Sequence, residues 1–128
     1  MKVVAFNGSP NPDGNTAILL RKVLSPIARA GIDTKLVQVG GNIIQGCTAC
    51  YHCFQAKDKR CVIGDDIVND CIAKMIAADA IIMGSPTYFA NMTAEMKALI
   101  DRAGLVAVAN GRLFSRNVGA AVAVNRRG

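Results

Sequence analysis

Short apolar runs alternate along the chain with longer segments in which apolar residues recur at helical spacing. The runs expected to form strands are residues 2–6, 34–39, 80–83 and 118–124. The segments with helical spacing cover about residues 16–30, 65–76 and 93–103. Strands that alternate with helices in this way favour a doubly wound parallel sheet covered by helices on both faces, a three-layer α/β/α fold.

Individual residues indicate where these elements begin and end. Asp65 or Asp66 is expected to cap the second helix, and Thr93 the third. Gly31 follows the first helix, where a left-handed residue commonly ends a helix. Pro26 lies inside the first helix, and because an interior proline costs about 3 kcal/mol we expect a kink or a break there.

The composition narrows the class of protein. Apolar residues make up 52% of the 128 residues and charged residues 19%, so we expect one folded domain, residues 1–128. No apolar run reaches the ~20 residues that a membrane helix needs, and the N-terminus lacks the features of a signal peptide. We therefore expect a cytoplasmic protein, in which five cysteines indicate metal or redox chemistry rather than disulfides.

The net charge of +6 is biased toward the C-terminal end. No acidic residue follows Asp101, whereas five arginines do: Arg102, Arg112, Arg116, Arg126 and Arg127. These arginines are scattered and few aromatic residues accompany them, so we do not expect nucleic-acid binding. The remaining interpretations are an ordinary solvated surface and compensation for anionic cofactors.

The turn after the first expected strand, residues 7–16, has the composition of a phosphate-binding loop. Its glycines allow close approach of the backbone to a ligand, and the helix N-terminus that follows offers unpaired N–H groups. Ser9, Asn15 and Thr16 add neutral donors. The triphosphate-binding P-loop motif and the dinucleotide motif are both missing, which favours a phosphate monoester such as that of FMN. Ordinary capping of the helix by Asn15 or Thr16 is the alternative.

A second loop, residues 84–91, follows the expected strand at 80–83. Open α/β sheets bind ligands where strand order reverses, which in a 2-1-3-4-5 sheet lies between the first and third strands. Backbone N–H groups, a rigid proline and the aromatic residues Tyr88 and Phe89 suit a flat ring with polar edges, such as isoalloxazine. Alternatively, the two aromatic residues belong to the core or to an interface.

Together, the loop Asn7–Thr16 and the segment Gly84–Arg102 resemble the NAD(P)H-dependent FMN reductase family of flavodoxin-like proteins. The resemblance covers nearly the whole chain and implies a flavodoxin-like fold, FMN as cofactor and NAD(P)H as electron donor. The implied phosphate contacts are Ser9, Asn11, Asn15 and Thr16, and the implied contacts to the ring and ribityl chain are Pro86, Thr87, Tyr88, Phe89 and Asn91. Relatives often carry an arginine in place of Asn11, so we expect weaker phosphate affinity here.

Four of the five cysteines, Cys47, Cys50, Cys53 and Cys61, form the pattern C-x2-C-x2-C-x7-C in a cysteine-rich insertion at residues 46–64. Four thiolates suit an iron–sulfur cluster, and bacterial ferredoxins use a similarly compact run. A structural zinc site more often pairs two C-x2-C units across a longer gap. The spacing favours iron–sulfur, with zinc and free or reversibly oxidised thiols as alternatives. Cys71 lies on the apolar face of the next helix and is expected in the core.

This motif, placed before the helix at 65–76, resembles the iron–sulfur flavoproteins, a branch of the same family. The resemblance implies that the four cysteines bind a [4Fe-4S] cluster. The expected function is a flavin-dependent oxidoreductase that transfers electrons between the cluster and FMN, with a small molecule or a ferredoxin-like protein as partner. The alternatives are an NAD(P)H-dependent FMN or quinone reductase without a cluster, and a non-catalytic flavodoxin-like carrier. No residue stands out as a catalytic acid or base.

A flavodoxin-like sheet has a fifth strand, and this chain carries four expected strands. Members of the family continue with another helix, a fifth strand and a final helix, so we expect a fold truncated after the fourth strand. A fourth strand left at the edge exposes unpaired backbone groups, which favours association into a homo-oligomer.

Overall fold

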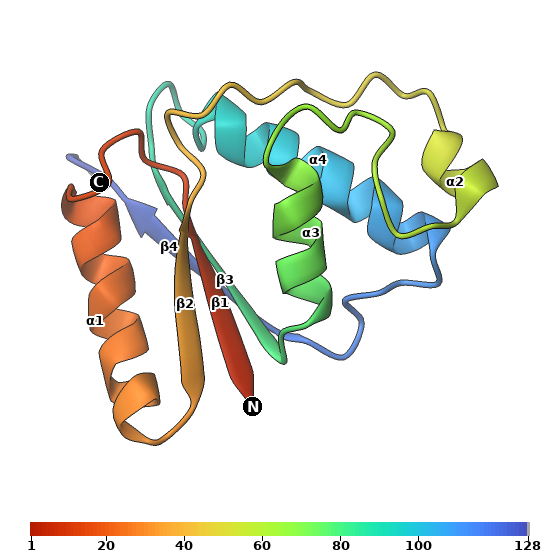
Figure 1. The fold of residues 1–128 in the computed structure, drawn as a ribbon. Coiled ribbons are helices and arrows are strands. Elements are labelled where there is room, and N and C mark those ends of the chain that lie inside the picture. Colours follow the sequence, from red (N-terminus) through yellow and green to blue (C-terminus); the bar gives the residue numbers. More distant parts are fainter. Residues whose placement is uncertain (128) are drawn as a thin grey trace.

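The computed structural model describes residues 1–127 and contains one parallel sheet flanked by helices (Figure 1). Its elements are β1 (Lys2–Asn7), α1 (Asn15–Arg29), β2 (Asp33–Gln38), α2 (His52–Ala56), α3 (Val68–Ile76), β3 (Ala80–Pro86), α4 (Ala94–Ala109) and β4 (Val118–Val124). The strands lie in the order β2-β1-β3-β4, and all neighbours are parallel. Helix α1 covers one face, and α3 and α4 cover the other. The expected doubly wound, three-layer architecture is therefore confirmed.

The strands and α1 begin and end close to the residues expected from the pattern, whereas α4 continues to Ala109, beyond the expected end at 103. α3 begins at Val68 with Ile67 as its N-cap, so the expected capping by Asp65 or Asp66 is wrong. β4 coincides with the expected run, β2 begins and ends one residue earlier, and β3 extends to Pro86. The short helix α2 inside the cysteine-rich segment was not expected, because five residues are too few to establish a helical period. No helix among residues 1–127 is long and apolar enough to cross a membrane.

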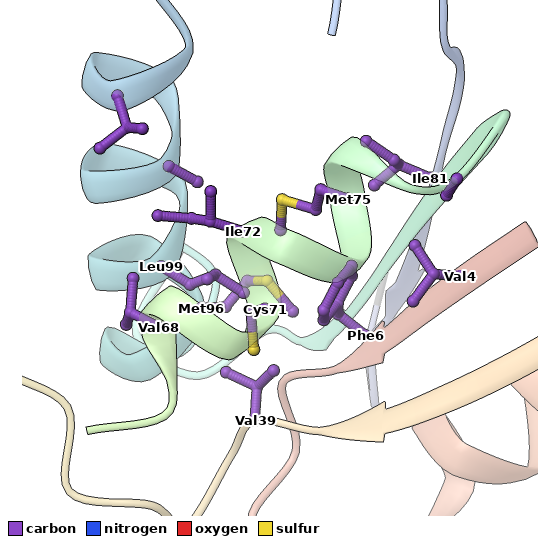
Figure 2. Packing of buried hydrophobic residues seen from close by; sticks show 13 residues of the cluster. Val4, Phe6, Val39, Val68, Cys71, Ile72, Met75, Ile81, Met96 and Leu99 are labelled. Atoms are coloured by element: carbon purple, nitrogen blue, oxygen red, sulfur yellow. The ribbon is translucent and has the colours of Figure 1, made fainter. Parts of the chain in front are cut away.

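Strand β1 forms the centre of the core because its alternate side chains serve both faces of the sheet. Val4 and Phe6 belong to the cluster under α3 and α4, and Figure 2 shows Phe6 directed toward α3. Val3 and Ala5 belong to the opposite cluster, together with Leu20 of α1. Burial of β1 on both faces explains why its sequence is a continuous apolar run.

The expected break of α1 at Pro26 does not occur. The helix continues to Arg29, and the carbonyl of Pro26 accepts the N–H of Ala30 at 3.1 Å. Pro26 and Lys22, whose carbonyl loses its helical partner, both lie on the exposed face, where water can satisfy that carbonyl. Gly31 follows with φ of +81°, so its expected place after the helix is confirmed.

The loops after β1 and β3 meet at the carboxyl edge of the sheet. The N–H of Gly8 donates to the carbonyl of Gly84 at 2.7 Å. The hydroxyl of Thr93 donates to the carbonyl of Gly8 at 2.8 Å and accepts the N–H of Met96 at 3.4 Å. Thr93 therefore caps α4, as expected, and also ties that helix to the first loop. These contacts lie at the switch point of the sheet, where ligands of this architecture bind.

The loop after β2 packs equally closely, and this contact can be tested at Gly40. A Cβ added there would lie 2.3 Å from the carbonyl carbon of Ser9 and 2.4 Å from the carbonyl oxygen of Gly8. Backbone atoms cannot turn aside as a side chain can, so we expect Gly40→Ala to lower the free energy of unfolding by about 1–3 kcal/mol. Urea denaturation followed by circular dichroism measures this change.

Gly104→Ala is the matched control. A Cβ at Gly104 meets nothing within 4 Å on the exposed face of α4, and alanine raises helix propensity there by up to about 1 kcal/mol. We expect this variant to be at least as stable as the unchanged protein. Full stability of Gly40→Ala would contradict the close packing of the two loops.

Candidate functional site

The two loops singled out in the sequence line one open groove at the carboxyl edge of the sheet. Its volume is about 500 Å³, within the range of small-molecule sites. Seven of the expected flavin contacts line it: Ser9, Asn11, Asn15, Thr16, Pro86, Thr87 and Tyr88. The other lining residues are Gly14, Val124 at the end of β4, and Asn125 and Arg126 directly after it. The fold thus brings together two motifs that are far apart in the sequence.

Phe89 and Asn91, the other expected flavin contacts, are not among the residues that line the groove. Phe89 is 97% exposed and Tyr88 61%, so the interpretation of these aromatic residues as core is wrong. The N–H of Tyr88 donates to the carbonyl of Asn91 at 3.0 Å, which closes a tight turn with Phe89 near its tip. Contacts of Phe89 and Asn91 with a flavin stay a prediction.

Side chains within the first loop hold its shape. Asn7 accepts the N–H of Ser9 at 3.1 Å and donates to the side chain of Gln38 at 2.8 Å. Gln38 in turn donates to the carbonyl of Ser9 at 2.6 Å. The hydroxyl oxygen of Ser9 accepts the N–H of Asn11 at 3.2 Å, so its own proton can be directed to a ligand. These hydrogen bonds, formed by side chains of Asn7, Ser9 and Gln38, fix the backbone conformation of the first loop.

The first turn of α1 presents backbone N–H groups at the groove. The helix begins after Gly14, whose backbone is extended, and no side chain caps it. The N-cap of α1 is Gly14, so the alternative for this loop, capping by Asn15 or Thr16, is wrong. The first turn holds no acidic residue, and the nearby Asp13 pairs with Arg21 at 3.1 Å. Free N–H groups and the helix dipole favour an anion at this point.

Arg126 is a groove residue that sequence reasoning did not assign. It follows β4, whose carboxyl end lies beside that of β3. Its guanidinium brings a positive charge to a groove that Asn11 also lines. In the sequence, the only indication that Arg126 lies at the groove was its position just after the expected strand at 118–124. That position points to the groove only once β4 is known to lie beside β3.

The four expected metal ligands, Cys47, Cys50, Cys53 and Cys61, line one small pocket of about 20 Å³. Cys47 and Cys50 are exposed, Cys53 and Cys61 are partly buried, and all four are free thiols. Left-handed residues such as Tyr51 turn the backbone between them. Within residues 1–127, no three His, Cys, Asp or Glu side chains lie close enough to hold a metal ion. The four sulfurs thus line the same small pocket but do not lie close enough together to hold a metal ion as they stand.

Side chains from two helices hold Cys61. Asn69 of α3 accepts the N–H of Cys61 at 2.8 Å and donates to its carbonyl at 2.9 Å. Arg102 of α4 donates from Nε to the Cys61 sulfur at 3.4 Å. Arg102 is 1% exposed and forms an ion pair with Asp66, whose side chain is 6% exposed. Sequence reasoning placed neither Asn69 nor Arg102 at this site, because only tertiary packing brings them to it.

Hydrogen bonds keep the buried pair charged. Burial alone would raise the pKa of Asp66, but bonds from Arg102 and from two backbone amides outweigh burial and lower that pKa below its usual value. Burial would lower the pKa of Arg102, but the bonds to Asp66 and Cys61 outweigh it and raise that pKa. A guanidinium cation therefore lies against the cysteine pocket at neutral pH.

An open groove at the switch point of a doubly wound sheet is typical of α/β proteins that bind nucleotide-like cofactors. The sequence profile of NADPH-dependent FMN reductases matches residues 1–128. The chain belongs to this family, as its two loop motifs predict.

Similar curated proteins include several iron–sulfur flavoproteins. One from Methanocaldococcus jannaschii is 40% identical over 124 residues, which are 97% of this chain and 62% of that protein. Another, from Archaeoglobus fulgidus, is 37% identical over 116 residues, which are 91% of this chain and 55% of that protein. The expected resemblance to this branch of the family is confirmed. The chain spans less than two thirds of the length of these relatives.

Solved structures with the same architecture include two reductases. A flavone reductase superposes on 98% of this chain and 43% of its own, with a TM-score of 0.70 and 17% identity. An NAD(P)H:quinone oxidoreductase from Methanothermobacter marburgensis superposes on 98% of this chain and 64% of its own, with a TM-score of 0.68 and 15% identity. At such low identity a superposition shows only that the fold is shared. These two superpositions confirm the flavodoxin-like fold class.

The five thiols are expected to differ sharply in reactivity. Cys71 is fully buried, as predicted, and burial, with a further contribution from Asp70, raises its pKa from 9.0 to about 11. This shift lowers its thiolate fraction about a hundredfold. Iodoacetamide should therefore label the four loop cysteines of the metal-free protein at about pH 8 and spare Cys71 until guanidinium unfolds the chain. Peptide mass spectrometry measures the labelling, and rapid modification of Cys71 in the folded protein would contradict its burial.

Proposed function

We propose that this protein is an FMN-dependent oxidoreductase that carries a [4Fe-4S] cluster and transfers electrons between its two cofactors. The observation that carries the proposal is the single groove in which the loops after β1 and β3 meet. Membership of the FMN reductase family supports the flavin, and the names of the relatives support the cluster. The groove and the cysteine pocket are built mainly from different segments, so each half of the proposal can be tested separately.

In this proposal the first loop binds the FMN phosphate. The backbone amides at the start of α1 and the side chains of Ser9, Asn11, Asn15 and Thr16 donate to its oxygens. Thr16 is 2% exposed and Ser9 8%, so both hydroxyls occupy well-defined positions. Arg126 adds a positive charge at the same groove. Neutral donors around one helix N-terminus suit one phosphate monoester better than a chain of phosphates.

The second loop holds the flavin ring and the ribityl chain through Pro86, Thr87, Tyr88, Phe89 and Asn91. The N–H of Thr87 donates to the carbonyl of Val124 at 3.0 Å, which anchors the start of this loop to β4. An aromatic side chain as exposed as Phe89 leaves a large apolar surface in water. A bound ring or a redox partner would cover that surface.

The four loop cysteines ligate the cluster. They line one pocket, and a [4Fe-4S] cluster takes four thiolates, one for each iron, so the residues present fit the group in number and chemistry. The pocket, at about 20 Å³, must widen to admit it. When bound, FMN accepts a hydride or two electrons, whereas the cluster passes one electron at a time. The chain itself contributes the thiols, the Cys61 contacts from Asn69 and Arg102, and the buried charge behind them.

One helix connects the two sites. Thr93, the N-cap of α4, contacts the first loop, and Arg102 on the same helix contacts Cys61. The rise of an α-helix places these two residues about 13 Å apart along its axis.

The proposed donors are NAD(P)H and a ferredoxin-like protein, and the acceptor is a small molecule or another redox protein. Assembly into a homo-oligomer stays a proposal.

The phosphate end of the proposal can be tested by charge. A carboxylate at position 9 or 16 would repel a phosphate, so Ser9→Asp and Thr16→Asp should each weaken FMN binding at least about tenfold, or ~1.4 kcal/mol. Quenching of flavin fluorescence during titration measures the affinity. At position 16, in the first turn of α1, the helix dipole favours an aspartate. Ser9 and Thr16 are both buried, so circular dichroism must show that each variant is folded before lost binding is attributed to charge.

Ser115→Asp is the control for the added negative charge, because Ser115 is exposed and is not among the groove residues. It should bind FMN as the unchanged protein does. Unchanged FMN affinity in both Ser9→Asp and Thr16→Asp would remove the first loop from the site.

The cluster is tested by metal content. Protein made and purified without oxygen should be brown and contain about four irons and four sulfides per chain. Serine at any of the four loop cysteines should remove the brown absorbance, whereas Cys71→Ser should keep it, because Cys71 is buried on the sheet side of α3. FMN should remain bound in all five variants.

Zinc in stoichiometric amount, without iron or sulfide, would refute the cluster and favour the reductase without one. Steady-state assays then separate the flavin functions. Oxidation of NAD(P)H with a small acceptor supports a reductase, and reduction by ferredoxin alone supports a carrier.

A further inference from the structure

Arg102 is a fully buried arginine whose side chain reaches four groups around the cysteine pocket. Its Nη1 donates to the carbonyl of Gln45 at 3.0 Å and to the carboxylate of Asp66, and its Nη2 donates to the carbonyl of Ile63 at 2.7 Å. Its Nε donates to the sulfur of Cys61 at 3.4 Å. All three nitrogens of the guanidinium are thus used, and Nη1 serves two of the four acceptors.

The two carbonyls that Arg102 binds bracket the cysteines in the sequence. Gln45 precedes Cys47, and Ile63 follows Cys61. Figure 1 shows the chain leaving β2, passing over α4 to α2 and returning to α3. One side chain of α4 therefore fastens both ends of the segment that carries all four cysteines. This closes a long surface loop, whose ends would otherwise be free to separate.

The guanidinium is itself held in place. Asp66, directly before α3, accepts from Arg102 and also accepts the N–H groups of Val68 at 3.0 Å and Gln45 at 3.3 Å. The carboxylate of Asp66 therefore orients the arginine and also holds Gln45, at the N-terminal end of the segment. Asn69 of α3 binds the backbone of Cys61 and donates to the carbonyl of Ile63 at 3.2 Å, the same carbonyl that accepts from Arg102.

We propose that Arg102 is the positioning residue of the cysteine site: it holds the two ends of segment 45–63 together and directs an N–H at the Cys61 sulfur. The inference rests on the proposed cluster and deepens it. A hydrogen bond to a ligand sulfur stabilises added negative charge, so it raises the reduction potential of the cluster. Lysine cannot replace the arginine, because one ammonium group cannot reach acceptors arranged around a planar fork.

The test uses three variants of the full chain. Arg102→Lys keeps the positive charge but removes the planar guanidinium group with its several N–H donors. Arg102→Gln combined with Asp66→Asn removes both charges, so that no buried carboxylate is left unpaired. Lys97→Gln is the control, because it removes an exposed ion pair with Asp101 on the same helix, and within residues 1–127 Lys97 forms no hydrogen bond or ion pair with the segment.

The first measurement is amide hydrogen exchange in metal-free protein, which needs no cluster. We expect segment 45–63 to exchange at least about tenfold faster in Arg102→Lys and in the double variant, with β1 and α1 unchanged. Lys97→Gln should match the unchanged protein. Equal protection of the segment in Arg102→Lys would overturn the inference, even where the double variant fails to fold.

The second measurement is the midpoint potential of the anaerobically loaded protein. It should fall in Arg102→Lys and stay constant in Lys97→Gln, a change that a purely structural residue would not cause. An unchanged potential with a full cluster would overturn the tuning role while leaving the proposed function intact. A chain that never binds iron would overturn the proposed function, and hydrogen exchange would still decide whether Arg102 holds the segment.

Discussion

The place of β1 between β2 and β3 is the constraint on which the rest of the molecule depends. β1 pairs in parallel with both neighbours, so the chain must cross over the sheet after every strand. The crossover through α1 covers one face, and the crossover through α3 covers the other. The loops after β1 and β3 are therefore left side by side, joined by the Gly8–Gly84 hydrogen bond, and no helix separates them. The position of the groove is therefore set by the strand order, and individual side chains only line it.

Helix α4 supports both candidate sites. At its N-terminus, Thr93 holds the first loop, and farther along, Arg102 holds the cysteine segment. Between these contacts, Leu99 packs into the core under the sheet, which fixes the helix in place. Each site is thus built from irregular chain, but each is anchored to the same rigid element. This arrangement can hold loops in defined positions although they have few backbone partners of their own.

Local patterns predicted most of the elements, because strands and helices follow from periodicity within a few residues. The run Val118–Val124 became β4 without any change in bounds. Of the kink or break expected at Pro26, the break was wrong, because Pro26 and Lys22 lie on the exposed face, where water can satisfy the carbonyl that loses its helical partner. Both loops of the groove were recognised by composition, whereas the exposure of Phe89 was not, because an aromatic residue in a loop is compatible with core, interface or ligand.

By itself, the sequence determined which chemistry is available: four cysteines in one segment, a loop of neutral donors before a helix, and an alternation of strands and helices that allows one class of fold. Only the tertiary structure decided which residues serve those groups. In the sequence Arg102 is one of several scattered arginines, and its bonds to Asp66 and Cys61 span 36 and 41 residues. Arg126 likewise joins the groove only because β4 lies beside β3. Periodicity encodes which face of an element is buried, but the partner of a buried charge is set by how whole helices pack, and no local pattern records that.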